Sequence, residues 1–149
     1  MTRRLLPHVT KRDLVAVLAG VLLLASFAIP AFNGYLERSR VARAVSDIGT
    51  LSLQLYRWQR DANRLPANLA EAGLGGDDPW GRPYVYVRAA GASQARLRKD
   101  GQLDPVNSDF DLYSLGADAE TALALPAAPS RDDVVRADDG AYIGLAVNY

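Results

Sequence analysis

The run from Leu14 to Phe32 limits what this chain can fold into more than any other segment does. It contains nineteen residues without a charge, and Ser26 carries its only side-chain hydroxyl. As a helix it would span roughly 28 Å at about 1.5 Å per residue, close to the thickness of a bilayer's hydrocarbon core. Backbone polar groups in lipid must be satisfied within the segment, so a lone span must be helical. We predict one transmembrane helix over residues 14–32; the alternative is a buried core helix, which the absence of a polar stripe disfavours.

Charges on the two sides of this run predict its direction across the membrane. The tail before it carries four basic residues: Arg3, Arg4, Lys11 and Arg12. Short basic flanks stay in the cytoplasm. We expect residues 1–13 to be cytoplasmic and residues 33–149 to lie on the far side of the membrane. A cleaved secretory signal is the alternative interpretation, because Ser26 and Ala28 form a small-x-small cleavage pattern.

Composition restricts the functions of the exported part. The 149-residue chain has a formal net charge of zero, which argues against nucleic-acid binding. It has no cysteine, so neither a disulfide nor thiol chemistry is available. Its one histidine, His8, precedes the span, and no spacing marks a nucleophile with a base, a phosphate-binding loop or a zinc site. We therefore do not expect an enzyme.

A helical pattern continues from the span to about Ala62. Apolar residues recur at steps of three and four from Val41 to Trp58, and most charged residues fall outside that stripe. Pro66 ends the pattern, because a proline disfavours helical geometry in the residue before it. We predict one long helix whose first half faces lipid and whose second half packs on a single domain formed by residues 33–149.

The rest of the chain is predicted to form a small antiparallel sheet. Tyr84–Ala89 is aromatic and β-branched, Ala95–Lys99 is its expected partner, and Asp109–Ser114 alternates polar and apolar residues. The alternation predicts one solvated face for Asp109–Ser114. A long loop is expected after Gly116, and Ala141–Val147 is expected to be a strand or a packed tail. The predicted fold class is α+β, with a long N-terminal helix packed on a small antiparallel β-sheet and a C-terminal loop region.

Acidic residues are concentrated in the C-terminal third. From Asp100 onward there are ten acidic residues and two basic ones, Arg131 and Arg136. Carboxylate and carbonyl oxygens on flexible loops suit Ca²⁺, which takes roughly six to eight such ligands. A solvated acidic surface explains the same composition, and the spacing matches no EF-hand. Composition alone leaves both interpretations open.

Three motifs give the chain a family resemblance. They are Asn63-Arg64-Leu65-Pro66, DPWGRPY over residues 78–84 and DLYSLGAD over residues 111–118, and they follow a span with Pro30 near its end. Together they resemble the major pseudopilins of type II secretion systems, over nearly all of the chain after residue 8. The resemblance implies a pilin-like fold and a subunit of a short periplasmic filament, associating with itself and with other pseudopilins. It also implies an anchor in the bacterial inner membrane and contact with the secretion system's inner-membrane platform.

The resemblance further implies a processing site and an assembly residue. In this family a prepilin peptidase cuts after a glycine, and a glutamate follows as the fifth mature residue. Counting back from Pro30 makes Val9 the first mature residue and Asp13 the fifth, with His8 where the family has glycine. In lipid, Asp13 would pair with the N-terminal amine of a neighbouring protomer. The alternative for Asp13 is a place among the lipid head groups beside Arg12.

A structural calcium ion in the loop from Leu115 to Val135 is also implied. Asp118 and one or both of Asp132 and Asp133 are expected to supply carboxylates. The backbone carbonyl of Leu115 is expected to help complete the shell. These acids would repel one another without a cation between them. The alternative function is a single-span membrane protein that never polymerises and whose periplasmic domain binds Ca²⁺ or a partner.

Overall fold

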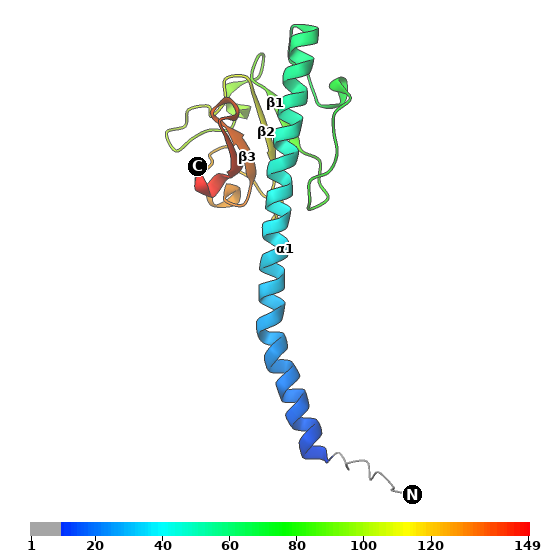
Figure 1. Ribbon diagram of the computed structural model, residues 1–149. Coiled ribbons are helices and arrows are strands. Elements are labelled where there is room, and N and C mark those ends of the chain that lie inside the picture. Colours follow the sequence, from blue (N-terminus) through cyan, green and yellow to red (C-terminus); the bar gives the residue numbers. More distant parts are fainter. Residues whose placement is uncertain (1–9) are drawn as a thin grey trace, which may run out of the picture. The chain divides into compact units, whose positions relative to one another are not determined.

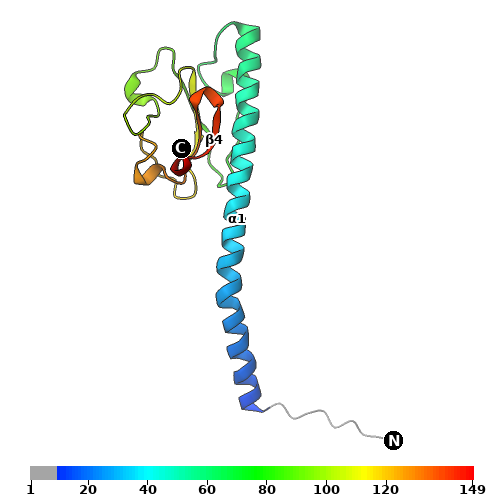
Figure 2. The ribbon, with the colours of Figure 1, turned by 60° about the vertical axis from the view of Figure 1, so that its left-hand side comes forward.

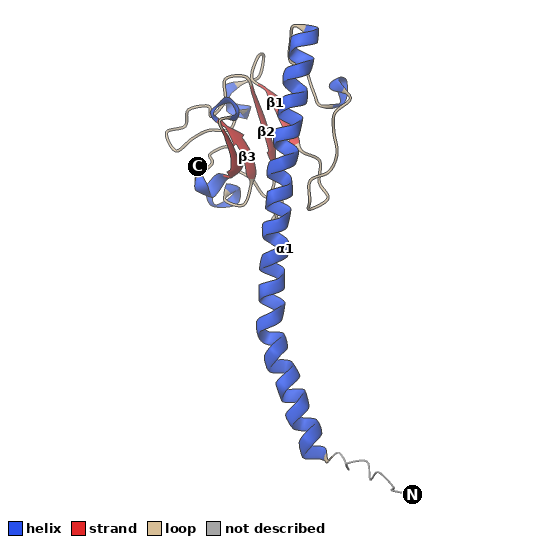
Figure 3. Ribbon diagram, viewed as in Figure 1, coloured by secondary structure: helices blue, strands red, loops and turns tan. Residues whose placement is uncertain are grey.

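The computed structural model describes residues 10–149, and Figure 3 shows their secondary structure. The chain divides into two compact units, Met1–Arg38 and Ser39–Tyr149. One α-helix, α1 (Lys11–Ala62), runs through the boundary between them and contains Pro30. This confirms the prediction of a single helix that continues from the apolar run to Ala62.

The described part of the first unit is the apolar half of α1. Within residues 10–149, α1 is the one helix long and apolar enough to cross a membrane. Its large apolar side chains are exposed; for example, Leu24 is 70% and Phe27 is 73% exposed. The hydroxyl of Ser26 donates to the carbonyl of Leu23 at 2.6 Å, so it is satisfied within the helix. Length, composition and exposure all suit a helix surrounded by lipid.

The second unit packs the other half of α1 on a four-stranded antiparallel sheet (Figure 1). Each strand pairs with the next one along the chain, in the order β1-β2-β3-β4. The strands are β1 (Val85–Arg88), β2 (Phe110–Ser114), β3 (Val134–Ala137) and β4 (Tyr142–Leu145). In the turned view of Figure 2, β4 lies beside α1. The α+β layout, a long helix on a small antiparallel sheet, is confirmed.

The main core of this unit lies between α1 and the sheet. Ala44, Ile48 and Leu55 of the helix are fully buried. They belong to the same cluster as Phe110 and Leu112, which alternate along β2. A helix with one apolar stripe and a strand with period two bury these faces against each other, which explains why the two elements pack here.

A second apolar cluster covers the opposite face of the sheet. Its buried members are Val106, Tyr113, Leu125, Val135, Ala137 and Ala146. As a result β2 is buried at every position, and the prediction of a solvated face on this strand is wrong. Asp111 lies on the covered face. Its buried carboxylate is satisfied there because it accepts hydrogen bonds from the Asn107 amide at 2.8 Å and the Arg98 backbone N at 2.7 Å.

Two other predictions about the sheet need correction. Ala95–Lys99 is not the partner of β1, which pairs with β2 in the register Val85↔Tyr113. A short 3₁₀ helix occupies Gln94–Arg96 instead, and the chain then turns so that Arg98 is buried. Strand β3 lies within the region predicted to be a loop. For Ala141–Val147 the alternatives were a strand or a packed tail, and the structure has strand β4, followed by the short 3₁₀ helix Ala146–Asn148.

Candidate functional site

The DPWGRPY and DLYSLGAD motifs contact each other. The Asp78 carboxylate, 4% exposed, accepts hydrogen bonds through Oδ1 from the backbone N of Trp80 and of Arg82, both at 3.0 Å. Its Oδ2 accepts the hydroxyl of Ser114, at the end of β2, at 2.5 Å. The Arg82 guanidinium donates to the carbonyl of Gly116. The turn at residues 78–84 therefore holds the start of the loop that follows β2.

That loop is closed by a carboxylate from its far end. Oδ2 of Asp132 accepts hydrogen bonds from the backbone N of Ala117 at 2.7 Å and of Asp118 at 3.0 Å. Gly116 has φ +63°, and a Cβ there would lie 2.3 Å from the Asp132 carbonyl oxygen, so only glycine fits the approach. Oδ1 of Asp118 accepts from the backbone N of Glu120 at 2.8 Å. Two of the predicted calcium ligands, Asp118 and Asp132, are thus brought together in one loop.

Asp133 points to a different environment. Its side chain is fully buried, and its Oδ2 accepts hydrogen bonds from Nη2 of Arg98 at 2.7 Å and the Thr121 hydroxyl at 2.6 Å. Burial raises the pKa of the Asp133 carboxyl, while the Thr121 hydroxyl and the charge of Arg98 lower it. Sequence analysis left open whether one or both of Asp132 and Asp133 would bind calcium with Asp118. The pairing with Arg98 favours Asp132 for that role, because the charge of the guanidinium already offsets that of Asp133.

Of the predicted calcium ligands, the loop offers two carboxylates, the smaller of the two numbers that the sequence analysis allowed. Within residues 10–149 there is no group of three or more His, Cys, Asp or Glu side chains that could hold a metal ion. The hydrogen bonds to Asp118 and to Asp132 each engage one carboxylate oxygen. The other oxygen of each residue could serve as a metal ligand. Calcium also accepts backbone carbonyls as ligands. The loop therefore supplies two carboxylates, those of Asp118 and Asp132, and backbone carbonyls would have to supply the other ligands of a calcium ion.

Sequence patterns did not predict a second polar cluster, which joins α1 to the sheet. The buried guanidinium of Arg136 donates to both oxygens of Asp109 at 2.8 and 2.7 Å, to the carbonyl of Phe110 at 2.8 Å and to the hydroxyl of Tyr56 at 2.5 Å. The Tyr56 hydroxyl in turn lies 3.0 Å from Asp109 Oδ2 and 3.1 Å from the carbonyl of Asp139. In the sequence, the one sign of this cluster is Arg136, a charged residue inside the otherwise apolar stretch VVRA of β3.

At the start of α1, Asp13 is hydrogen-bonded within its own chain. Its Oδ2 accepts from the backbone N of Thr10 at 2.9 Å and from the Thr10 hydroxyl at 2.7 Å. The Thr10 hydroxyl lies 3.3 Å from the backbone N of Asp13, so the two residues cap the helix reciprocally. His8 and Val9, the predicted processing site, lie outside the described residues.

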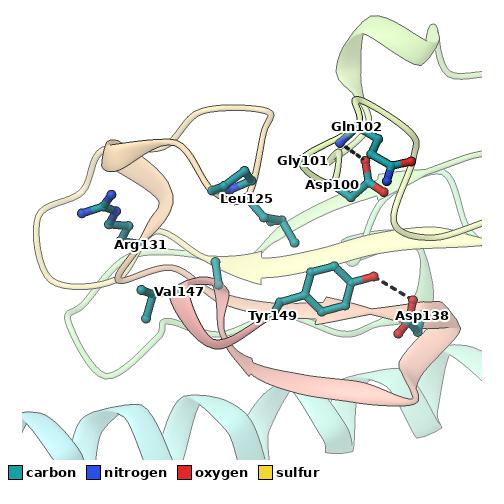
Figure 4. Close-up of a pocket in the computed structure, with 10 residues that line it drawn as sticks. Asp100, Gly101, Gln102, Leu125, Arg131, Asp138, Val147 and Tyr149 are labelled. Carbon is teal, nitrogen blue, oxygen red and sulfur yellow. Dashed lines mark hydrogen bonds between the residues drawn. The ribbon is translucent and has the colours of Figure 1, made fainter.

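An open groove of about 730 Å³ lies near the C-terminus (Figure 4). Its apolar lining comes from Leu125, Pro126, Ala146, Val147 and Tyr149. Figure 4 shows Asp100 and Asp138 at one end of the groove and Arg131 at the other. We call this surface the C-terminal groove.

No protein-family model, curated protein or solved structure matches the chain. Its function is therefore inferred from its own residues and geometry.

Proposed function

We propose that this protein is a structural subunit of a pilin-like filament, the pseudopilus of a type II secretion system. In this proposal residues 14–32 anchor it in the bacterial inner membrane, with residues 1–13 in the cytoplasm and residues 33–149 in the periplasm. The filament assists export across the outer membrane and contains other pseudopilins, and its base contacts the inner-membrane platform.

The observation that carries this proposal is the continuity of α1. One helix of 52 residues is apolar and exposed in its first half and packs on the sheet in its second half. Exposed apolar side chains along a helix are covered either by lipid or by neighbouring helices. A subunit built this way is stable in the membrane before assembly and in a bundle of parallel helices after it.

The proposed role of Asp13 rests on the cost of a charge in an apolar bundle. A carboxylate there needs a partner, and the amine exposed by cutting before Val9 would supply it from the next protomer. The hydrogen bonds from Thr10 would hold Asp13 at the helix start until that partner arrives.

We also propose that one Ca²⁺ joins the two ends of the loop between β2 and β3. Asp118 and Asp132 are its carboxylate ligands, and the carbonyl of Leu115 is one of its backbone ligands. The loop is already closed by the hydrogen bonds from Ala117 and Asp118 to Asp132, so little further ordering is needed. A bound ion would supply positive charge between the two carboxylates and stiffen the segment.

A second candidate is a single-span membrane protein that stays uncut and never polymerises. The presence of His8 where the resembled family has glycine favours it. Mass determination of the chain extracted from membranes distinguishes the two. A chain that begins at Val9 is expected for the filament subunit, whereas a chain that begins at Met1 would favour the uncut anchor.

A further inference from the structure

An exposed row on α1 combines one apolar and two basic side chains. Leu53, Arg57 and Arg60 follow a spacing of four and three residues, so they lie on one face of the helix. Leu53 is 63% exposed, whereas Leu51 and Leu55 are buried against the sheet. Arg60 contacts Asp61 at 3.3 Å, but both side chains are more than 70% exposed and such a pair is weak. We call these three residues the helix row.

The C-terminal groove has complementary chemistry. Leu125 and Ala146 are buried members of its wall, and Val147 is 55% exposed along it. At its acidic end, Tyr149 donates its hydroxyl to Oδ1 of Asp138 at 2.8 Å. Oδ1 of Asp100 accepts two backbone N–H groups at 2.8 and 2.9 Å. These bonds hold both carboxylates in place and engage one oxygen of each.

The two surfaces lie on opposite sides of the sheet. Leu125 and Ala146 belong to the cluster on the face away from α1. In Figures 1 and 2 the C-terminus lies across the sheet from the helix. A row and a groove of one molecule therefore cannot contact each other, whereas those of two molecules can.

We propose that the C-terminal groove binds the helix row of a second copy of this chain. Arg57 and Arg60 of one copy then meet Asp138 and Asp100 of the next. Leu53 packs against the exposed side chain of Val147. Arg131, at the other end of the groove, repels the basic end of the row and so fixes the direction in which it docks.

This contact is heterologous, because it joins different surfaces of two identical chains. Each added copy leaves one row and one groove free, so the contact propagates into an open chain if its rotation does not close a ring. The inference rests on the proposed function and names the surfaces through which subunits meet outside the membrane. A standard interface buries about 800 Å² on each partner, so contacts between the apolar halves of α1 must add to it.

Cysteine cross-linking tests the contact in the full-length chain in membranes. The protein has no cysteine, so introduced thiols are unique. We expect the double variant Leu53→Cys/Val147→Cys to give a ladder of disulfide-linked species on oxidation. An equal mixture of the two single variants should give a dimer only. Dimers from the Leu53→Cys variant alone would show a symmetric helix contact and would overturn the proposal.

Charge neutralisation tests the acidic end of the groove. In Asp100→Asn/Asp138→Asn each side chain keeps an oxygen that accepts its present hydrogen bonds, so the fold is retained while the charge is lost. The change removes the two proposed ion pairs of Arg57 and Arg60 with the next copy. In the Leu53→Cys/Val147→Cys chain we therefore expect the cross-linked yield to fall about fivefold. The matched control is Asp104→Asn/Glu120→Gln, which removes two exposed acids outside the groove and should leave the yield unchanged. Equal yields from both pairs would contradict the role of the groove.

The outcome also separates this inference from the proposed function. Filaments that contain the chain but yield no ladder would overturn the docking surfaces and leave the filament proposal standing. If neither filaments nor a ladder form, both are wrong. A groove of this volume is also of the size that takes a small molecule. A small-molecule occupant would appear as a chain that does not cross-link and co-purifies with a low-mass compound, which would likewise overturn the proposal.

Discussion

At the scale of single residues, Gly116 is the glycine of the described chain at which an added Cβ would approach other atoms most closely. It combines φ +63° with a backbone oxygen 2.3 Å from where a Cβ would lie. We expect Gly116→Ala to lower the free energy of unfolding by about 2 kcal/mol or more, from left-handed strain plus the clash. Chemical denaturation of the purified chain in detergent measures the loss. Gly101→Ala is the control, because a Cβ there meets only Pro126 at 3.8 Å; an equal loss in both would contradict the strain argument.

Asp118 and Asp133 both come from the segment between β2 and β3, and we predict different roles for them. Asp133→Ala would leave the buried guanidinium of Arg98 without its partner, and we expect a loss of about 3–5 kcal/mol, with or without calcium. Asp118 is exposed, so Asp118→Ala should change little in the presence of chelator.

Thermal melts with Ca²⁺ and with chelator check both statements. Calcium at a hundredfold excess over its dissociation constant should stabilise the parent by about 2.7 kcal/mol. Asp118→Ala should abolish that shift, whereas Asp133→Ala should keep it at a lower midpoint. A parent melt that calcium does not move would eliminate the proposed site.

At the scale of elements, the joint between α1 and the sheet depends on Tyr56. Its hydroxyl contacts Arg136 and Asp109 and lies 3.1 Å from the carbonyl of Asp139. We expect Tyr56→Phe to cost about 1–2 kcal/mol, because removing the hydroxyl leaves part of a buried polar cluster unsatisfied. Tyr35→Phe is the matched control on the same helix, since Tyr35 is 67% exposed. Hydrogen exchange should show faster opening around β2 only in Tyr56→Phe; unchanged exchange there would show that apolar packing alone holds the helix.

The elements differ in how far the sequence predicts them. Strong local periodicity predicts α1 from end to end, and β-branched and aromatic residues predict β1. β3 was missed because Arg136 and the preceding acids make it resemble a loop, and its strand geometry depends on partners on both sides. The alternation of polar and apolar residues in β2 likewise predicted a solvated face, because it does not show that a second cluster covers that face. Asp111 is buried through donors from Asn107 and Arg98, which a strand pattern does not reveal.

The candidate site was predictable only in part. Asp118 and Asp132 share a loop, as the family resemblance implied, and hydrogen bonds from the backbone N of Ala117 and Asp118 to Asp132 close it. The pairing of Asp133 with Arg98 joins residues 35 positions apart. A contact of that kind depends on how the sheet's second face is covered, and the sequence carries no periodic signal for it.

At the scale of the whole molecule, tyrosines predict the response to alkaline pH. Burial and the hydrogen bond to Asp47 raise the pKa of Tyr84, burial raises that of Tyr86 to about 12, and the hydrogen bond to Asp138 raises that of Tyr149 to about 12. In the unfolded chain a tyrosine ionises near pH 10. Above that pH the unfolded state loses protons that the folded state keeps, so stability should fall as the pH rises.

Tyrosinate absorbance and circular dichroism, recorded together over an alkaline titration, check this expectation. The ionisation of most tyrosines and the loss of the fold should coincide. If most of the seven tyrosines ionised near pH 10 with the fold intact, the buried environments would be contradicted.

Assembly is the central claim, and it concerns the molecule as a whole. Electron microscopy with an antibody to residues 33–149 tests it most directly, on cells of the source organism that overproduce either the parent or Asp13→Ala. We predict short labelled filaments from the parent. From Asp13→Ala we predict a folded, membrane-bound chain without filaments, because the charge is needed only between packed helices. A parent chain confined to the membrane fraction, with no labelled filament, would contradict the proposal that this protein is a pilin-like subunit.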